Sequence, residues 1–577
     1  MMLRNGEGNR GLWRRGVRGF MVTLLLFCAS PSAVLSMPPV PSAPAHSTEK
    51  EYFEIIKSID LLGEVYREVS KSYVDTLNVS GLMYAGIDGM LRTLDPYTLF
   101  LDADDSNELD EMTSGQYVGI GISISSLEDE VFITSVVDDY AAAKAGIKVG
   151  DSVVAINNKR VKSLSLDKVK ALMKGASGTP LLIELERQGS APFSVRVIRQ
   201  EVRLSTVSYS GIIGGVGYIE MKSFGARSTA DLREALQGLS RLASEQRIAL
   251  KGIILDLRNN PGGLLNVAVD VTSLFVPKGS EVVSIRGLQP ELGRSYVTGT
   301  PPLDAALPLA VLINTQSASA AEIVAGAMQD LDRGVVIGER SYGKGLVQSV
   351  IRLSYNTALK VTTSKYYTPS GRLIQKESNN AVSESRKVLL PVPGKNLSEV
   401  FYTKGRRKVF GGGGIMPDIL FSEPPVSSYL SELGKRGLLF LFASVYRSTH
   451  PLTPQLPLDR PALMTLFDDF LHTRKFMYTT DTERHFNELK ESLKRAQPVS
   501  SDSVQQCVTA FQREIARLKE QEIAKESAQV AGALEVEILR HYDEPLARRA
   551  ELDHDLTVKK AIEVLSDGRQ YSKILHP

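Results

Sequence analysis

Ser319 has the surroundings that a nucleophilic serine needs. It follows a short apolar segment, Leu309–Ile313, and stands directly before a helix-forming run that starts at Ala320. A serine at a strand-to-helix junction can expose its hydroxyl, and the N–H groups of the first helical turn point toward a developing oxyanion. Serines before helices are also common N-caps, so this segment alone leaves both roles open.

Lys344 is the second candidate for chemistry, because it lies between Gly343 and Gly345 in an uncrowded backbone. A lysine acts as a general base only when neutral, so burial must lower its pKa from about 10.4 toward about 7–8. That shift costs about 4 kcal/mol. A phosphate-binding loop would need Ser or Thr where Gly345 stands. A solvent-facing lysine on a hairpin stays open as an alternative.

The distribution of histidine favours lysine as the base. All seven histidines lie outside residues 47–449, at positions His46, His450, His472, His485, His541, His554 and His576. A Ser–His–Asp triad in the central region would need a base from a terminal extension, and a His-rich metal site fails for the same reason. We expect no metal and no cofactor.

The elements that must position these residues follow from the hydrophobic pattern. From about 203 to 380 the chain alternates strand-like and helix-like segments, with strands expected at 217–221, 252–257 and 309–313 and helices at 229–244 and 320–331. This alternation predicts an α/β domain whose sheet is largely covered by helices. Further strands are expected around 389–390 and 400–402.

Residues 117–202 have a different texture, with short β-branched runs, a turn at Ala145–Asp151 and a helix at 166–173. Together these features resemble a PDZ domain. The loop of Val118, Gly119, Ile120 and Gly121 matches the carboxylate-binding loop of that family. Its glycines would let backbone N–H groups converge on the terminal carboxylate of a peptide, while a strand edge pairs with the peptide backbone.

The N-terminus has the pattern of a secretory signal peptide, with basic residues before an apolar stretch at 20–29 and then small residues and prolines. An uncleaved signal anchor is the alternative. Cleavage near Ala33 or Ser36 would remove Cys28 and leave Cys507 as the one cysteine of the mature chain, which excludes an internal disulfide. The net charge of +2 on 577 residues gives no argument for nucleic acid as a partner.

Both ends of the mature chain are expected to be helical. Residues 49–115 carry apolar positions at helical spacing, and the region after about 424 is rich in charged residues with apolar faces at 510–528 and 550–565. Nothing in the C-terminal region looks catalytic, so we interpret it as a packing or oligomerisation extension.

Several separated motifs resemble those of the carboxyl-terminal processing peptidases, a family of Ser–Lys peptidases (the tail-specific proteases of peptidase family S41) with a ClpP/crotonase-like core. The motifs are residues 255–263, 317–322, 329–330, 343–348 and 365–372. The resemblance covers about residues 50–425 and implies Ser319 as nucleophile, Lys344 as general base and Gln348 as the residue that orients the lysine. It also implies an oxyanion hole from the N–H of Ala320 and one N–H of the Gly262–Gly263 turn. Ala321 stands at a position where the family often has serine. This difference removes a hydroxyl near the start of the helix but leaves the expected nucleophile, Ser319, in place.

The sequence thus predicts a multidomain α/β protein: signal peptide 1–36, N-terminal helical region 49–115, inserted PDZ domain 117–202, peptidase core 203–423 and helical extension 424–577. The expected function is that of an exported serine endopeptidase of the periplasm or cell envelope. Its expected partners are substrate proteins with free C-terminal tails. A homo-oligomer, a dimer or larger, is also expected, and a regulatory adaptor is a further partner that we consider. A non-catalytic scaffold, a trypsin-like peptidase and an acyl-CoA enzyme are the alternatives. The presence of Ser319, Lys344 and Gln348 argues against the scaffold. The histidine-free core argues against the trypsin-like peptidase, and the export signal argues against the acyl-CoA enzyme.

Overall fold

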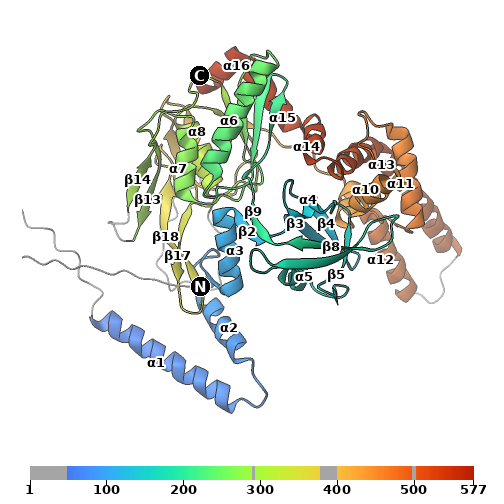
Figure 1. The fold of residues 1–577 in the computed structure, drawn as a ribbon, viewed down its shortest axis with the longest axis horizontal. Coiled ribbons are helices and arrows are strands. Elements are labelled where there is room, and N and C mark those ends of the chain that lie inside the picture. The colour runs from blue at the N-terminus through green and yellow to red at the C-terminus, as the bar shows by residue number, and fades with distance from the viewer. Residues whose placement is uncertain (1–48, 289–292, 377–398, 497–501, 577) are drawn as a thin grey trace, which may run out of the picture. The chain divides into compact units, whose positions relative to one another are not determined.

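The computed structural model describes residues 49–288, 293–376, 399–496 and 502–576 (Figure 1). The expected signal peptide and the strand expected at 389–390 lie outside these residues. Contacts divide the chain into two units, 1–85 and 86–577. Within the described ranges, no helix has the length and apolar character needed to cross a bilayer.

The first unit is dominated by the long helix α1 (Glu49–Ser72), which leads into α2 (Val79–Leu91). Tyr66 of α1 donates a hydrogen bond to the carbonyl of Val79. The apolar side chains that recur along α1 at helical spacing are exposed, among them Tyr52, Ile55, Ile59, Leu62 and Val69. This helix therefore has an apolar face that its own unit does not cover.

The second unit is built on a six-stranded sheet in the order β10-β11-β12-β15-β16-β21. The strands are β10 (Val207–Ile213), β11 (Val216–Met221), β12 (Ile253–Asp256), β15 (Leu309–Ile313), β16 (Val335–Gly338) and β21 (Ile419–Leu420). β10 pairs antiparallel with β11, and all other pairs are parallel. Every residue of β11, β12, β15 and β16 is buried, as expected for parallel strands covered on both faces.

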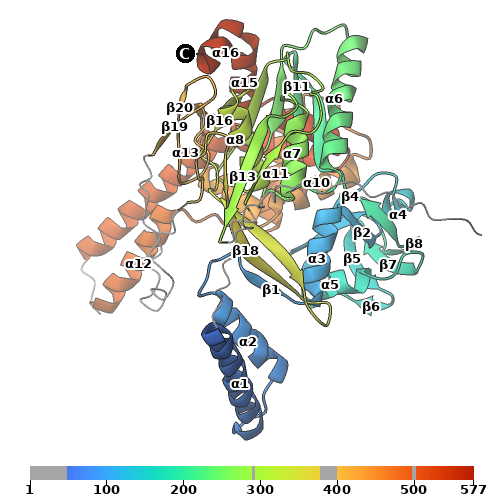
Figure 2. The same ribbon diagram turned by 90° about the vertical axis from the view of Figure 1, so that its left-hand side faces the viewer.

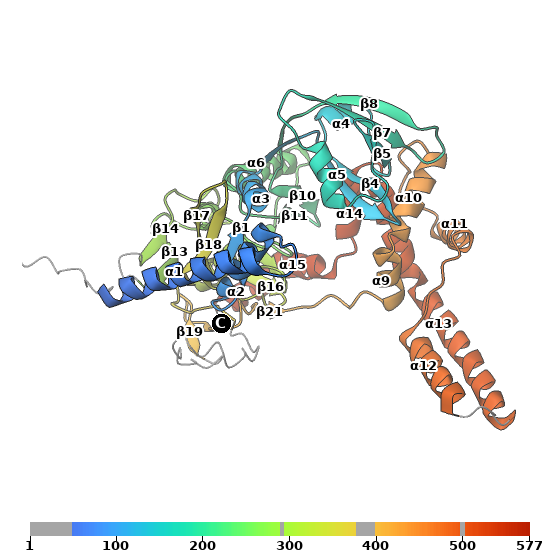
Figure 3. The ribbon, with the colours of Figure 1, turned by 90° about the horizontal axis from the view of Figure 1, so that it is seen from below.

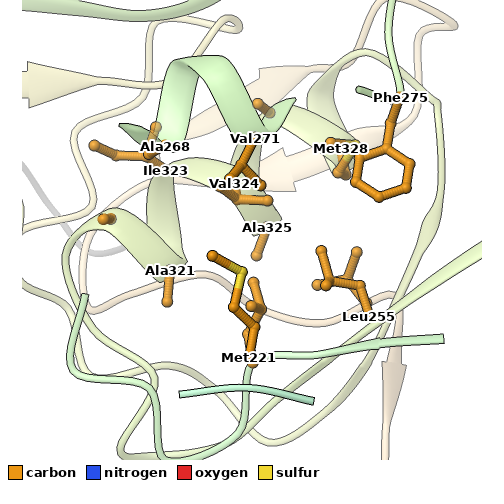
Figure 4. Close-up of a cluster of buried hydrophobic side chains, with 14 of the residues drawn as sticks. Met221, Leu255, Ala268, Val271, Phe275, Ala321, Ile323, Val324, Ala325 and Met328 are labelled. Carbon is orange, nitrogen blue, oxygen red and sulfur yellow. The ribbon is translucent and has the colours of Figure 1, made fainter. Parts of the chain in front are cut away.

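The two faces of this sheet are covered by helices from distant parts of the chain (Figures 1 and 2). On one face lie α6 (Ser228–Glu245), α7 (Leu265–Ser273) and α8 (Ala320–Asp330). Figure 4 shows side chains of α7 and α8 meeting Met221 and Leu255 of the sheet. On the other face the apolar cluster includes Leu552 of α14 (Glu544–Leu552), Val558 of α15 (Leu556–Ser566) and Leu575 of α16 (Gly568–Leu575).

A second sheet lies beside the core and carries the lysine segment. It contains β1 (Leu99–Leu101), β13 (Glu281–Gly287), β14 (Arg294–Val297), β17 (Leu346–Arg352) and β18 (Ala358–Tyr367). β17 and β18 form a hairpin, and Lys344 stands just before β17. β1 pairs with β18 and is followed by α3 (Ala103–Ser114), so the region expected to be helical also supplies a strand to this sheet.

The inserted domain contains the strands and helices between residues 116 and 203. Its short ladder joins β2 (Gln116–Gly119) to β9 (Gln200–Arg203), the two ends of the insertion. Its main sheet has the order β3-β4-β5-β7-β8, with β6 paired to β5. These elements are β3 (Ile122–Leu127), β4 (Glu130–Val136), β5 (Ser152–Ile156), β6 (Lys159–Arg160), β7 (Pro180–Glu186) and β8 (Phe193–Ile198), with helices α4 (Ala141–Lys144) and α5 (Leu166–Met173).

The C-terminal region after a small hairpin, β19 (Val400–Tyr402) and β20 (Lys408–Phe410), is helical as expected. It contains α9 (Ser428–Lys435), α10 (Leu438–Thr449), α11 (Arg460–Thr473), α12 (Asp481–Ala496) and α13 (Asp502–Arg540). α12 and α13 run side by side as a helical hairpin (Figure 3). The helix expected at 550–565 is divided into α14 and α15, because the side chain of Asp555 caps a new helix there.

Candidate active site

Ser319 stands at the first residue before α8, at the carboxyl end of β15. Its backbone has φ 56° and ψ −115°, a conformation that a non-glycine residue rarely adopts. Such strain costs on the order of 1–3 kcal/mol and must be supported by the surroundings. The serine is half-buried, and the turn therefore presents it at the helix N-terminus as the sequence predicts.

Lys344 lies partly buried in the loop between β16 and β17. Burial lowers the pKa of Lys344 to about 8, and the positive charge of Lys360 contributes to this lowering. Its ammonium lies 4.9 Å from the centre of the Tyr97 ring. Within the described residues no hydrogen bond joins the Ser319 hydroxyl to this ammonium. The structure thus has the lysine close to the pKa that a general base needs, with its side chain resting on an aromatic ring.

A buried carboxylate joins the serine and lysine segments. Oε2 of Glu322 accepts the N–H of Ser319 at 2.8 Å and that of Lys344 at 2.9 Å. Oε1 accepts the N–H of Gly343 at 2.7 Å and the hydroxyl of Ser341 at 2.6 Å. Burial raises the pKa of Glu322 to about 7, although all four donors favour its ionised form. Both candidate residues are therefore held against one side chain.

Tyr366 of β18 makes a second link between the two segments. Its buried hydroxyl donates to the carbonyl of Ser319 at 3.2 Å and to the carbonyl of Lys344. Burial raises the pKa of Tyr366 well above its usual value, so the hydroxyl stays a donor. Glu322 binds the N–H groups and Tyr366 the carbonyls, so the backbone of both residues is fixed on two sides.

The turn at Gly262–Gly263 packs directly against the serine. A side chain at Gly262 would place its Cβ within 2.8 Å of Ala320 N and Ser319 Cβ. The Gly262 N–H donates to Oδ1 of Asn260 at 2.9 Å, whereas the N–H groups of Gly263 and Ala320 have no protein acceptor in the described part of the chain. The structure brings the three residues of the expected oxyanion hole together and leaves two of their donors available.

Gln348 lies on β17, four residues after the lysine. Its amide nitrogen is 3.5 Å from the carbonyl of Leu346 and 3.5 Å from the hydroxyl of Thr362. No hydrogen bond to Lys344 is present among the described residues. Thr362 in turn accepts a long contact from Thr98, which follows Tyr97. Gln348 is thus connected to the same short segment that provides the ring beneath the lysine.

Other residues of the family motifs hold the loops around the site. Arg372 is fully buried and donates to Gln329 and to Asp330, both at 2.6 Å. Asp330 also accepts the N–H and the hydroxyl of Ser370. These contacts fasten the end of α8 to the loop after β18, so these motif residues have a structural role.

The PDZ loop of Val118, Gly119, Ile120 and Gly121 runs from β2 into β3. Gly121 has φ 84°, a backbone that favours glycine. β3 lies at the edge of its sheet, and partly buried apolar side chains of both β3 and α5 pack against the apolar core of this domain. The N–H groups of Gly121 and Ile122 approach the hydroxyl of Tyr117, where they oppose the rise in its pKa that burial causes. The hydroxyl oxygen of Tyr117 therefore lies at the loop that is expected to bind the carboxylate.

The sequence reasoning missed three residues that contact the candidate dyad. Glu322 could have been found, because a serine followed three residues later by glutamate before an apolar run is a capping pattern. Tyr97 and Tyr366 give no such local signal. Their contacts with Lys344 depend on the pairing of β18 with β1 and on the packing of β18 against the core.

Three family models match this chain. Peptidase family S41 matches residues 215–382, and the PDZ domain model matches residues 109–186. A third model, described as a probable PDZ-protease C-terminal helical domain, matches residues 429–565. Together they correspond to the core, the inserted domain and the C-terminal helices described above.

The proteins that this chain resembles are described as carboxy-terminal-processing proteases. A carboxy-terminal-processing protease of Bartonella bacilliformis is 37% identical over 321 residues, which is 55% of this chain and 73% of the relative. The carboxy-terminal processing protease CtpA of Bacillus subtilis is 30% identical, with 55% of this chain and 67% of the relative covered. A solved photosystem II D1 C-terminal processing protease is 27% identical, with 63% of this chain and 92% of that chain covered and a TM-score of 0.33. The chain therefore belongs to the carboxy-terminal-processing serine proteases of peptidase family S41.

Proposed function

We propose that this peptidase hydrolyses peptide bonds through Ser319 and Lys344, after its PDZ domain has captured the C-terminal tail of a protein substrate. The observation that carries the proposal is the pKa of Lys344, which burial lowers to about 8, on a backbone fixed to that of Ser319 by Glu322. A lysine with this pKa is neutral in a useful fraction near neutral pH.

The reaction is an acyl transfer. Neutral Lys344 leaves the Tyr97 ring and accepts the proton of Ser319, whose oxygen attacks the peptide carbonyl. The N–H groups of Ala320 and Gly263 stabilise the oxyanion. Collapse breaks the C–N bond, and the lysine returns its proton to the leaving amine. Water, deprotonated by the same lysine, then hydrolyses the acyl-enzyme, while Gln348 keeps the lysine side chain in reach.

A quenched fluorescent peptide with an apolar C-terminal residue tests the dyad. Ser319→Ala and Lys344→Ala are each expected to reduce turnover at least about a thousandfold, because each removes a member of the reacting pair. Ser240→Ala, on the exposed surface of α6, is the matched control and retains wild-type turnover. Full proteolysis by either dyad variant would contradict the assignment, and an inactive wild type would favour a scaffold.

The substrates proposed are cell-envelope proteins with free tails, and the N-terminal pattern supports export to the periplasm or cell envelope. The edge strand β3 and the partly buried apolar side chains of β3 and α5 fit an extended tail with an apolar last residue. Mass spectrometry of envelope proteins incubated with wild type or with Ser319→Ala would reveal new peptide termini only with the wild type. Recovery of the protein with residues 1–48 intact in the cytoplasmic fraction would contradict export.

We also propose that the chain forms a homo-oligomer through α1. The exposed apolar face of α1 carries Ile59 and Leu62, which are 63% and 65% exposed. A second copy offers an identical, self-complementary face. Sedimentation velocity should give a dimer or larger species for the wild type and a monomer for Ile59→Asp/Leu62→Asp. An unchanged mass would contradict this interface.

A further inference from the structure

The C-terminal helices α14 and α15 meet the core at the carboxyl ends of β11 and β12. Two acidic residues stand at these strand ends, Glu220 and Asp256, and both are buried. A polar cavity of about 560 Å³ opens beside them and is lined by both the core and the C-terminal helices. Charged side chains in such a place need partners, and the C-terminal helices supply them.

The first contact runs through Arg258. Its guanidinium donates to Asp256 at 2.6–3.0 Å and, through the same Nη2, to Asp555 at 2.7 Å. Asp555 uses its other oxygen to accept the N–H of Val558 and so to start α15. Burial raises the pKa of Asp256, but the charge of Arg258 and the hydrogen bonds from Arg258 and Tyr218 together lower it below its usual value. Arg258 is therefore held between one carboxylate of the core and one of the C-terminal region.

The second contact runs through Arg548 of α14. Its Nη2 donates to Glu220 at 2.6 Å and to the Tyr218 hydroxyl at 3.1 Å. The Tyr218 hydroxyl donates to Oδ2 of Asp256 at 2.7 Å. Asp555 and Arg548 are therefore both connected to the buried carboxylate of Asp256. Asp555 is connected through Arg258, and Arg548 is connected through Tyr218.

The chain leaves this carboxylate directly into the turn beside Ser319. Arg258 donates its own N–H to Asp256 at 2.9 Å, and the residues that follow it are Asn259, Asn260, Pro261, Gly262 and Gly263. Within the turn, Asn260 accepts the N–H of Ala318 at 2.9 Å, next to the serine. Arg258 thus lies between the buried carboxylate of Asp256 and the start of this turn.

We propose that Asp555 and Arg548 are positioning residues that hold the oxyanion turn at Arg258–Gly263 in place. The C-terminal helical domain is then part of the catalytic apparatus of this peptidase. This inference rests on the proposed function, in which that turn supplies an oxyanion donor.

Asp555→Asn is the informative substitution, because asparagine still caps a helix but loses the charge that pairs with Arg258. Asp567→Asn is its matched control, since Asp567 caps α16 through the N–H groups of Arg569 and Gln570. We expect Asp555→Asn to lower kcat about tenfold with KM within about twofold, since a displaced donor weakens transition-state binding more than substrate binding. The control should change neither.

Hydrogen–deuterium exchange of the same variants is the readout that needs no activity. In Asp555→Asn the amides of residues 258–260 and 262–264 should exchange at least about fivefold faster, with those of α8 unchanged. Tyr218→Phe, which breaks the second route, should accelerate the same amides, and the double variant should be non-additive. Exchange equal to wild type in the turn, or the same acceleration in Asp567→Asn, overturns the inference. Faster exchange in the turn with an inactive wild type would instead contradict the proposed function alone.

Discussion

The residues around Ser319 and Lys344 and those around the PDZ loop are held in opposite ways. In the core, Glu322 and Tyr366 fasten both segments through buried hydrogen bonds on each side of the backbone. In the PDZ domain, the loop at 118–121 is followed by an edge strand with a neighbour on one side only. A rigid site suits chemistry that needs donors in fixed positions, and an open edge suits tails of varied sequence.

Among the residues that hold the two sites in place, Glu322 should give the largest effect. Glu322→Ala leaves four donors without an acceptor, so we expect turnover to fall at least about a hundredfold and the protein to lose about 3 kcal/mol of stability. Kinetics with the quenched peptide and urea unfolding measure the two quantities. Glu245→Ala, an exposed glutamate at the end of α6, should change neither. A fully active Glu322→Ala would show that the comparison is mistaken.

Tyr366→Phe tests the second link with less damage. The ring stays buried, but the hydroxyl that bonds the carbonyls of Ser319 and Lys344 is lost. We expect kcat to fall about tenfold with the fold retained, because small displacements of reacting groups are costly. Tyr367→Phe is the control, since the ring of Tyr367 packs on Arg286. Equal kcat in both variants would remove Tyr366 from the site.

Gly121→Ala tests the adaptable site. The new Cβ would lie 2.8 Å from Cβ of Tyr140, on a backbone with φ 84°. We expect the KM of a tailed substrate to rise about tenfold, whereas a short peptide without the tail is cleaved at the wild-type rate. Isothermal titration with the tail peptide checks the binding directly. Equal losses on both substrates would mean that the PDZ loop and the core are not separate in function.

The smallest effect is a shift of the pH profile. In the proposed mechanism turnover requires neutral Lys344, so kcat/KM should rise with pH through about 8, the pKa to which burial lowers this lysine. The charge of Lys360 contributes to that lowering, so Lys360→Gln should raise the pKa and move the rising limb by about half a unit to higher pH. That is about a threefold loss at pH 7. The exposed Lys278→Gln should leave the limb in place, and an acid shift in Lys360→Gln would contradict the sign.

The elements nearest to Ser319 were predictable because their signals are local. The helix expected at 320–331 is α8 (Ala320–Asp330), and the strand at 309–313 is β15 (Leu309–Ile313). A buried apolar strand, small residues and a helix of apolar periodicity follow each other there without interruption. The PDZ helix at 166–173 was predicted for the same reason.

The remaining contacts could not be predicted, because they join residues far apart in the sequence. Asp555 and Arg258 are 297 positions apart, and neither has a local pattern that points to the other. From the sequence, the C-terminal helices are interpreted as a packing or oligomerisation extension. Their apolar faces do pack, but the sheet they cover belongs to the peptidase core. A periodic pattern reveals that a face is buried and not what covers it.

That covering has a consequence for how the enzyme is made. Tyr571 exchanges hydrogen bonds with both backbone groups of Leu309, 262 positions earlier in the chain. The central strands are therefore synthesised long before the helices that shield their second face. Until α15 and α16 emerge, those strands expose an apolar surface and the dyad has an unfinished support. In this order of assembly, the support of the candidate active site is completed only after α15 and α16 have been synthesised.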